Sequence, residues 1–256
     1  AIIIGLWVAD EFSFDNFHQN GERIAMIMKN SEANSQKNTD PSIPLPLYEE
    51  LKNAYPEITH ITRLDWGATH NLAVGNNRLM KFGHFADASF LKIFSFPIHS
   101  GHKESMLSEP NSIVLTHSLA KLLFGDTDVL GKSVTLNNKY QLSITGVLED
   151  IPHHSTLQFD FIIPYEFNIL SDPSVKGRLE WWGDNFLRNI VMVRAGTSIE
   201  EFSSKIKSVI RDKTNSQNEG YLFAHPLRQW HLYSEFKDWV NIGGRIEYVR
   251  LFAIIV

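Results

Sequence analysis

The sequence predicts an α+β fold in which two α/β segments flank a strand-rich block. Three observations support this prediction. Apolar residues at helical spacing alternate with strand-like runs in residues 10–74 and again in residues 185–245. Residues 75–184 have mainly the pattern of strands, interrupted by brief helices. An uncharged apolar run stands at each end of the chain, at residues 1–9 and 251–256, which suggests that the two ends share one environment.

The composition is that of a folded domain and excludes several functions. The chain has 256 residues, of which 43% are hydrophobic and 21% charged, so it can form one large domain or two small ones. A net charge of −5 argues against a nucleic-acid partner, which would require a basic surface. Because the chain has no cysteine, it cannot form a disulfide, a thiolate metal site or a cysteine nucleophile.

The apolar ends are each far shorter than the ~20 residues that span a bilayer. We interpret residues 1–9 and 246–256 as stubs of two transmembrane helices. Trp7, Tyr248 and Arg250 suit the membrane interface, where aromatic rings and long basic side chains gather. The first run has no basic residues and no initiator methionine, so it fits a signal peptide poorly. The alternative is a pair of buried strands or a core helix, because short apolar runs are ambiguous.

Four elements are expected in the first α/β segment. The spacing of Phe17, Ile24 and Met28 predicts a helix within residues 17–28. Residues 30–42 contain no large apolar side chain and are expected to form a loop. An amphipathic helix over residues 47–54 and a strand over residues 58–64 follow.

The middle block, residues 75–184, contains five expected strands. They cover residues 78–85, 112–115, 133–136, 140–148 and 157–163. Residues 137–139, Asn-Asn-Lys, favour a hairpin turn between the third and fourth strands. A short helix is expected over residues 88–94. Another should start after Thr116 as N-cap and end before Gly125.

The last segment returns to a strand-then-helix pattern. A strand is expected over residues 190–193, and Ser198 with Glu201 forms a capping box that starts a helix. A closing strand is expected over residues 222–227, and residues 171–183 form the long return connection. The simplest assembly packs residues 10–74 and 185–245 into one subdomain and inserts residues 75–184 as a second.

The sequence predicts no catalytic, cofactor or metal site. Eleven histidines occur without metal-ligand spacing, and no phosphate-binding glycine motif is present. Ser118 and Lys121 match the S-x-x-K pattern of a serine nucleophile, but the S-D-N and K-T-G motifs that accompany it are absent. The carboxylates at Glu149, Asp150 and Asp160 are interpreted as solvated side chains. We therefore do not expect an enzyme, and a hydrolase is the lowest-ranked alternative.

Trp181 and Trp182 are the candidates for a ligand or partner contact, and if the domain is a ligand-binding sensor, the adjacent His153 and His154 are the other candidate region. Two neighbouring indoles could stack on a sugar or a drug, or they could anchor the return connection to the core. Burial of aromatic side chains is common, which favours the anchoring interpretation.

Five runs of sequence, in order, resemble the extracytoplasmic domain of MacB/FtsX-type ABC transporter permeases, in the form common in Bacteroidetes. They begin with DEFSFDNFH at residues 10–18 and include the stretch EPNSIVLT, which leads to AKLLFG. The runs lie at residues 10–18, 87–96, 109–125, 145–155 and 231–252. The resemblance covers essentially the whole chain, although Trp181, Trp182 and residues 30–42 carry no family signature.

The resemblance implies a porter-like α/β subdomain with an inserted, β-rich, sabre-like subdomain. It also implies a domain that faces the periplasm from the bacterial inner membrane and that does no chemistry. Its role would be to relay motion driven by a separate cytoplasmic ABC ATPase to an exported or extracted substrate, or to a periplasmic or outer-membrane partner. Such permeases commonly work as dimers. The alternative function is an extracytoplasmic ligand-binding sensor domain between two membrane spans.

Overall fold

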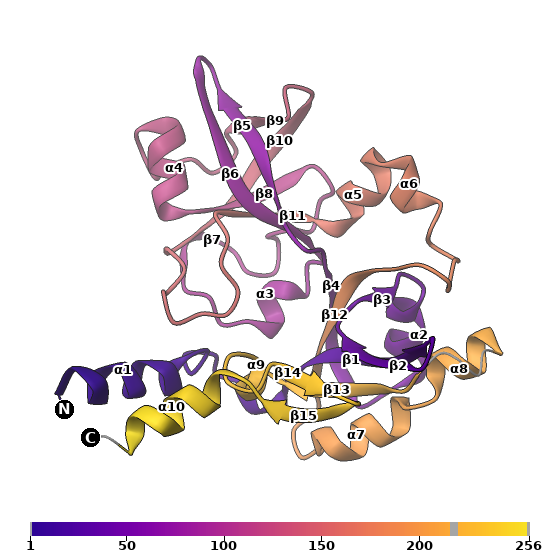
Figure 1. The fold of residues 1–256 in the computed structure, drawn as a ribbon. Coiled ribbons are helices and arrows are strands. Elements are labelled where there is room, and N and C mark those ends of the chain that lie inside the picture. Colours follow the sequence, from indigo (N-terminus) through magenta and orange to yellow (C-terminus); the bar gives the residue numbers. More distant parts are fainter. Residues whose placement is uncertain (1, 216–219, 255–256) are drawn as a thin grey trace. The chain divides into compact units, whose positions relative to one another are not determined.

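The computed structural model describes residues 2–215 and 220–254 and has the expected mixed α+β character. Residue 1 of the first predicted membrane stub and residues 255–256 of the second lie outside the described residues. Contacts divide the chain into two compact units (Figure 1). The first unit contains residues 1–59, 154–156 and 181–256, and the second contains residues 60–153 and 157–180.

The first unit is built on the long strand β1 (Ile24–Ala33). It pairs antiparallel with β12 (Asn185–Val193), β13 (Leu222–Pro226) and β2 (Gln36–Asp40). The short strand β3 (Ile43–Pro44) pairs with β12. Because β1 comes from the first third of the sequence and β12 and β13 from the last, the two ends of the chain together make this sheet.

Two expectations for the first segment are wrong. Residues 24–33 form β1 instead of the end of a helix, and residues 30–42 form strands instead of a loop. Ile24, Ala25 and Ile27 are completely buried, so β1 is covered on both faces and lacks the alternation of a half-exposed strand. The polar continuation folds back as a hairpin whose turn, at Asn34 and Ser35, has positive φ angles of 51° and 62°.

The first unit also contains seven described helical segments. They are α1 (Ile2–Ser13), η1 (Gly21–Arg23), α2 (Leu47–Ala54), α7 (Ile199–Ile206), α8 (Val209–Thr214), α9 (Leu227–Trp230) and α10 (Arg245–Ala253). The predicted helix over residues 47–54 is confirmed as α2, and the predicted Ser198 cap is confirmed by a bond of 3.3 Å from the Glu201 amide. The predicted helix after Ser198 divides into α7 and α8. An additional hairpin joins β14 (Glu235–Lys237) to β15 (Val240–Gly243).

The second unit begins within β4 (Ile58–Leu64). Its other strands are β5 (Ala68–Val74), β6 (Asn77–Ala86), β7 (Ile98–Gly101), β8 (Ser112–Thr116), β9 (Ser133–Leu136), β10 (Tyr140–Leu148) and β11 (Phe161–Pro164). Its helices are α3 (Phe90–Ile93), α4 (His117–Phe124), α5 (Tyr165–Ser171) and α6 (Pro173–Lys176). The β9–β10 hairpin turns at Asn137 and Asn138 as predicted, with φ angles of 50° and 56°.

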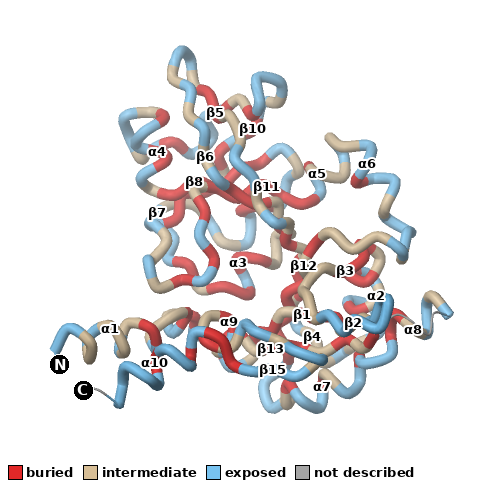
Figure 2. Tube along the Cα trace, viewed as in Figure 1, coloured by how far each residue is buried: buried red, intermediate tan, exposed pale blue. Residues whose placement is uncertain are grey.

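The core of the second unit lies between its strands and α4. Ile113 and Leu115 of β8, Ile144 of β10 and Phe161 of β11 are all at most 1% exposed (Figure 2). Gly125 ends α4 with a φ angle of 72°, as the sequence predicts. The side chain of Thr116 makes no cap bond; Asp150 accepts a hydrogen bond of 2.8 Å from the Ser118 amide instead.

Candidate functional site

The two ends of the chain form a pair of helices within the first unit. Helices α1 and α10 lie side by side (Figure 1), and the rings of Trp7 and Phe252 meet edge to face with centroids 5.4 Å apart. Ile246 and Val249 of α10 form a small buried cluster with Leu232, and Trp7 and Val8 of α1 pack against it. The first and last described segments are therefore held together as one structural element, which we call the end-helix pair.

The end-helix pair exposes many apolar side chains, although α10 also exposes the charged Glu247 and Arg250. Ile2 is 81% exposed, Ile3 83% and Leu6 67%, and on α10 Leu251 is 57% exposed (Figure 2). Exposing such side chains to water forfeits about 1.5–3 kcal/mol each relative to burial. Contiguous apolar surface of this kind marks a contact with another apolar phase or protein. Within residues 2–215 and 220–254, no helix has both the length and the apolar character needed to cross a membrane.

A buried carboxylate joins the two helices. The Glu11 side chain, 3% exposed, accepts a hydrogen bond of 2.7 Å from Nη2 of Arg245 at the start of α10. His231 Nε2 lies 2.6 Å from the other oxygen of Glu11, and the His231 ring stacks on Phe14. The bond from Arg245 holds the pKa of Glu11 below its usual value, so the carboxylate is charged at neutral pH. We call Glu11, His231 and Arg245 the Glu11 junction.

The turn that follows α1 is fixed by hydrogen bonds to a distant segment of the chain. Asp15, 1% exposed and with a φ angle of 59°, accepts a hydrogen bond of 2.9 Å from the Thr156 amide. Its own amide donates to the His154 carbonyl at 2.8 Å. Arg228 of α9 donates to the Asp15 carbonyl at 3.2 Å. Burial raises the pKa of the Asp15 carboxyl, because desolvation penalises its charged form.

These contacts tie both ends of the chain to other parts of the first unit. The Glu11 junction fixes α1 to α10, and the Asp15 turn fixes the end of α1 to α9 and to residues 154–156. Among the described residues, no group of three or more His, Asp or Glu side chains could hold a metal ion.

The structure gives the other motifs local roles. Ser118 bonds to Asp150, Glu149 lies 3.0 Å from His99, and Asp160 pairs with Lys81 at 3.2 Å. These carboxylates thus form contacts within the second unit. The residues of the S-x-x-K pattern, Ser118 and Lys121, lie in α4.

Trp181 and Trp182 lie at the point where the chain re-enters the first unit. Trp181 is 57% exposed, and Trp182 is half-buried. Their role in ligand or partner contact stays a prediction. Sequence reasoning missed the Glu11 junction, because its members are 220 and 234 residues apart. The only signal is a charged residue next to each apolar end, Glu11 after the first run and Arg245 before the second.

The fold and the end-helix pair define a class of protein, namely α+β domains in which the first and last helices lie side by side. A family profile described as the MacB-like periplasmic core domain matches residues 1–209. The chain therefore belongs to the MacB-like periplasmic core domain family, the periplasmic domains of ABC transporter permeases, and the resemblance seen in the sequence is confirmed. No curated protein matches the chain.

Solved structures share the fold. A domain of a permease protein from Porphyromonas gingivalis is 20% identical, with a TM-score of 0.68 over 82% of this chain and 92% of that chain. The periplasmic region of MacB from Actinobacillus actinomycetemcomitans is 15% identical, with a TM-score of 0.57 over 81% of this chain and 90% of that chain. The extracellular domain of the noncanonic ABC-type transporter YknZ from Gram-positive bacteria is 11% identical, with a TM-score of 0.56 over 78% of this chain and 98% of that chain. At these identities the likeness shows the fold alone.

Proposed function

We propose that this domain relays motion driven by ATP across the bacterial inner membrane to the periplasm. In this proposal α1 and α10 continue into two transmembrane helices, of which residues 1–9 and 246–256 are the stubs. A separate cytoplasmic ABC ATPase supplies the energy, and the domain does no chemistry of its own. The observation that carries the proposal is the Glu11 junction, in which the buried Glu11 pairs with the half-exposed Arg245 and ties together two helices that expose apolar side chains.

The division of the chain into two units supports a mechanical role. The first unit contains the end-helix pair, and the chain passes between the units near residues 59, 153, 156 and 180. Relative motion of two packed units about such connections is the usual structural basis of hinge and shear movements. We propose that a porter-like subdomain, predicted for residues 10–74 and 185–245, moves an inserted, sabre-like subdomain, predicted for residues 75–184, with residues 60–74 moving as part of the second unit to which their contacts assign them.

We further propose that the permease works as a dimer and acts on a substrate for export or extraction, or on a periplasmic or outer-membrane partner protein. A domain without chemistry of its own needs such a target if its motion is to have an effect.

The experiment measures whether ATP moves the units. These 256 residues contain no cysteine, so within them only two introduced cysteines carry spin labels, and any cysteines elsewhere in the permease or in the ATPase are replaced first. Lys237→Cys in the first unit and Lys176→Cys in the second form the test pair, since both side chains are exposed. In the full-length permease with its ATPase, we expect a non-hydrolysable ATP analogue to shift the distribution of distances between the labels.

A control pair lies entirely within the first unit, at Lys237→Cys and Asn53→Cys. Its distance distribution should stay constant, because a rigid unit moves as one body. An unchanged distribution in the test pair, in a complex that still hydrolyses ATP, contradicts the proposal.

A further inference from the structure

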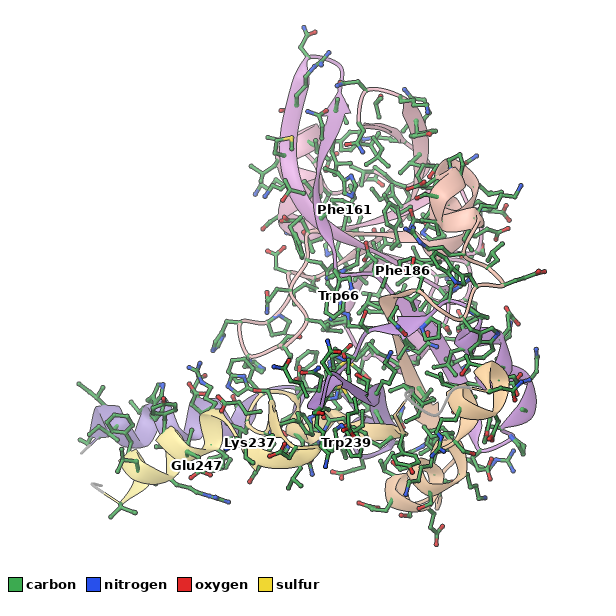
Figure 3. The ribbon with its side chains drawn as sticks, turned by 45° about the vertical axis from the view of Figure 1, so that its right-hand side comes forward. Trp66, Phe161, Phe186, Lys237, Trp239 and Glu247 are labelled. Atoms are coloured by element: carbon green, nitrogen blue, oxygen red, sulfur yellow. The ribbon has the colours of Figure 1, made fainter. Side chains whose placement is uncertain are left out.

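A hairpin with an unusual turn lies in the first unit, directly before α10 in the chain. The β14–β15 hairpin, which carries Lys237 and Trp239 (Figure 3), turns at Asp238 and Trp239 with φ angles of 51° and 70°. A bulky aromatic residue in the left-handed region is costly, and such strain persists where the surroundings hold the residue in place. Trp239 Nε1 donates a hydrogen bond of 3.1 Å to the Ser31 carbonyl, which fixes the indole.

Three cations gather on two aromatic rings at this hairpin. Lys37 Nζ lies 4.8 Å from the centre of the Trp239 ring. Lys207 and Arg211 lie 4.5 and 5.1 Å from the centre of the Tyr221 ring. In the described segments 2–215 and 220–254, none of these three cations forms an ion pair with a carboxylate. A ring positions a cation without neutralising it, so this group keeps a local positive charge.

The two rings line two cavities of ligand size. The larger, of about 790 Å³, is also lined by Lys29, Glu32 and Arg211. The smaller, of about 500 Å³, is also lined by Lys207 and by apolar side chains, among them Phe223 and Phe236. Both volumes are typical of small-molecule sites. Because Tyr221 and Trp239 line both cavities, a ligand that passes these rings reaches a cationic region on one side and an apolar region on the other.

We propose that this region, the Trp239 site, binds a small amphipathic anion. Its carboxylate, phosphate or sulfonate group lies beside Arg211 in the larger cavity, and its apolar part packs against Phe223, Phe236 and Trp239. The site goes beyond the proposed function and does not depend on it, because a domain that transmits no force could still bind such a ligand.

The test compares decanoate with decanol, which has the same tail without the charge, by isothermal titration into the 256-residue chain. Decanoate is used below the concentration at which it forms micelles. We expect saturable binding of decanoate and at least tenfold weaker binding of decanol. Equal affinities, or no saturable binding of decanoate, would overturn the proposal.

Substitutions locate the site. Arg211→Gln should weaken decanoate binding about fivefold and Lys207→Gln about twofold, which is the usual range for one partly exposed charge. Lys52→Gln is the matched control, because Lys52 also lies over a tyrosine ring of the first unit, 5.3 Å from the centre of Tyr48, but lines neither cavity. It should leave the affinity unchanged. If all three variants bind decanoate as the wild type does, the ligand lies elsewhere and the proposal is wrong.

Trp239 gives a test that separates binding from folding. Trp239→Gly removes the indole but suits a positive φ angle, so the chain should stay folded by circular dichroism while decanoate binding falls at least tenfold. Trp239→Phe keeps a ring and should retain part of the affinity. A folded Trp239→Gly chain that binds decanoate normally would contradict the role given to this side chain.

Discussion

Strand β8 and helix α1 are both short apolar runs, yet they end in opposite environments. In β8 all five residues of SIVLT are buried, and Leu115 is completely inaccessible. In α1 the run begins IIIGLWVA, and Ile2, Ile3 and Leu6 are between 67% and 83% exposed. Composition alone therefore does not decide burial. What differs is the partner, because β8 lies between β10 and β11, whereas α1 lies beside α10 and a small cluster of buried residues.

The comparison shows that exposed apolar side chains can indicate a surface that contacts a membrane or another protein. The free energy that β8 gains by burial inside its own unit is unavailable to the outer face of α1. A membrane around the end-helix pair, as in the proposed function, would supply it. The predictions below test how far the two runs differ and what fixes the end-helix pair in place.

The largest effect is expected from truncating the same side chain in each run. Leu115→Ala removes a buried side chain from β8 and leaves a cavity, so it should lower the free energy of unfolding by about 2–5 kcal/mol. Leu6→Ala removes an exposed side chain from α1 and should change it by less than about 0.5 kcal/mol. Urea denaturation of the 256-residue chain measures both. Similar losses in the two variants would show that α1 is buried by the chain itself.

A pH titration tests the stability of the first unit, to which the end-helix pair belongs. Burial lowers the pKa of His225 in β13 to about 4, whereas an unfolded histidine titrates near 6.5. Between these values the unfolded chain takes up a proton that the folded chain does not, so stability falls as the pH is lowered from about 6.5 to about 4. At pH 5 the contribution of His225 to this loss should be about 2 kcal/mol.

His225→Gln removes this titrating group and should flatten the dependence of the urea midpoint on pH. The slope should not vanish, because burial also lowers the pKa of His18 to about 4. A slope equal to that of the wild type would show that His225 titrates alike in the folded and unfolded chains.

The Glu11 junction should have a smaller, local effect. Glu11→Gln leaves the Arg245 charge without its buried carboxylate. Because the Arg245 side chain is 51% exposed, we expect a loss of about 1–2 kcal/mol, which is less than for a fully buried pair. Hydrogen exchange should become faster in α10.

The control is Glu247→Gln, which removes the exposed pair of Glu247 with Arg250 on the same helix, 59% and 60% exposed. It should cost less than about 0.5 kcal/mol and leave the exchange rates of α10 unchanged. Equal effects of the two variants would show that the Glu11 junction does not hold the helices together.

The sequence predicts the elements that have local signals. The structure confirms the hairpin turn at Asn137 and Asn138, the N-cap at Ser198 and the end of α4 at Gly125. Each of these features depends on residues only a few positions apart in the sequence. β1 was missed because its burial depends on β12 and β13, more than 150 residues away, and the spacing of Phe17, Ile24 and Met28 imitates a helix.

The candidate site was predicted only in its outline. The apolar ends were visible in the sequence, and the structure places α1 and α10 side by side. Glu11, His231 and Arg245 have ordinary local contexts, and only the fold of the whole unit brings them together. Trp181 and Trp182 were visible as an aromatic pair, but a sequence pattern does not show whether such a pair faces the core or a partner.

The smallest effect on stability is expected at Trp181, which extends the comparison of exposed and buried apolar residues to the return connection. Trp181→Ala should change the free energy of unfolding by less than about 0.5 kcal/mol, because the side chain is 57% exposed. The half-buried Trp182 should cost more when truncated, and urea denaturation measures both. If Trp181 contacts a partner, its variant should lose transport in cells although it folds normally. A large loss of stability in Trp181→Ala would instead identify this indole as an anchor of the connection and would remove the reason to expect a partner there.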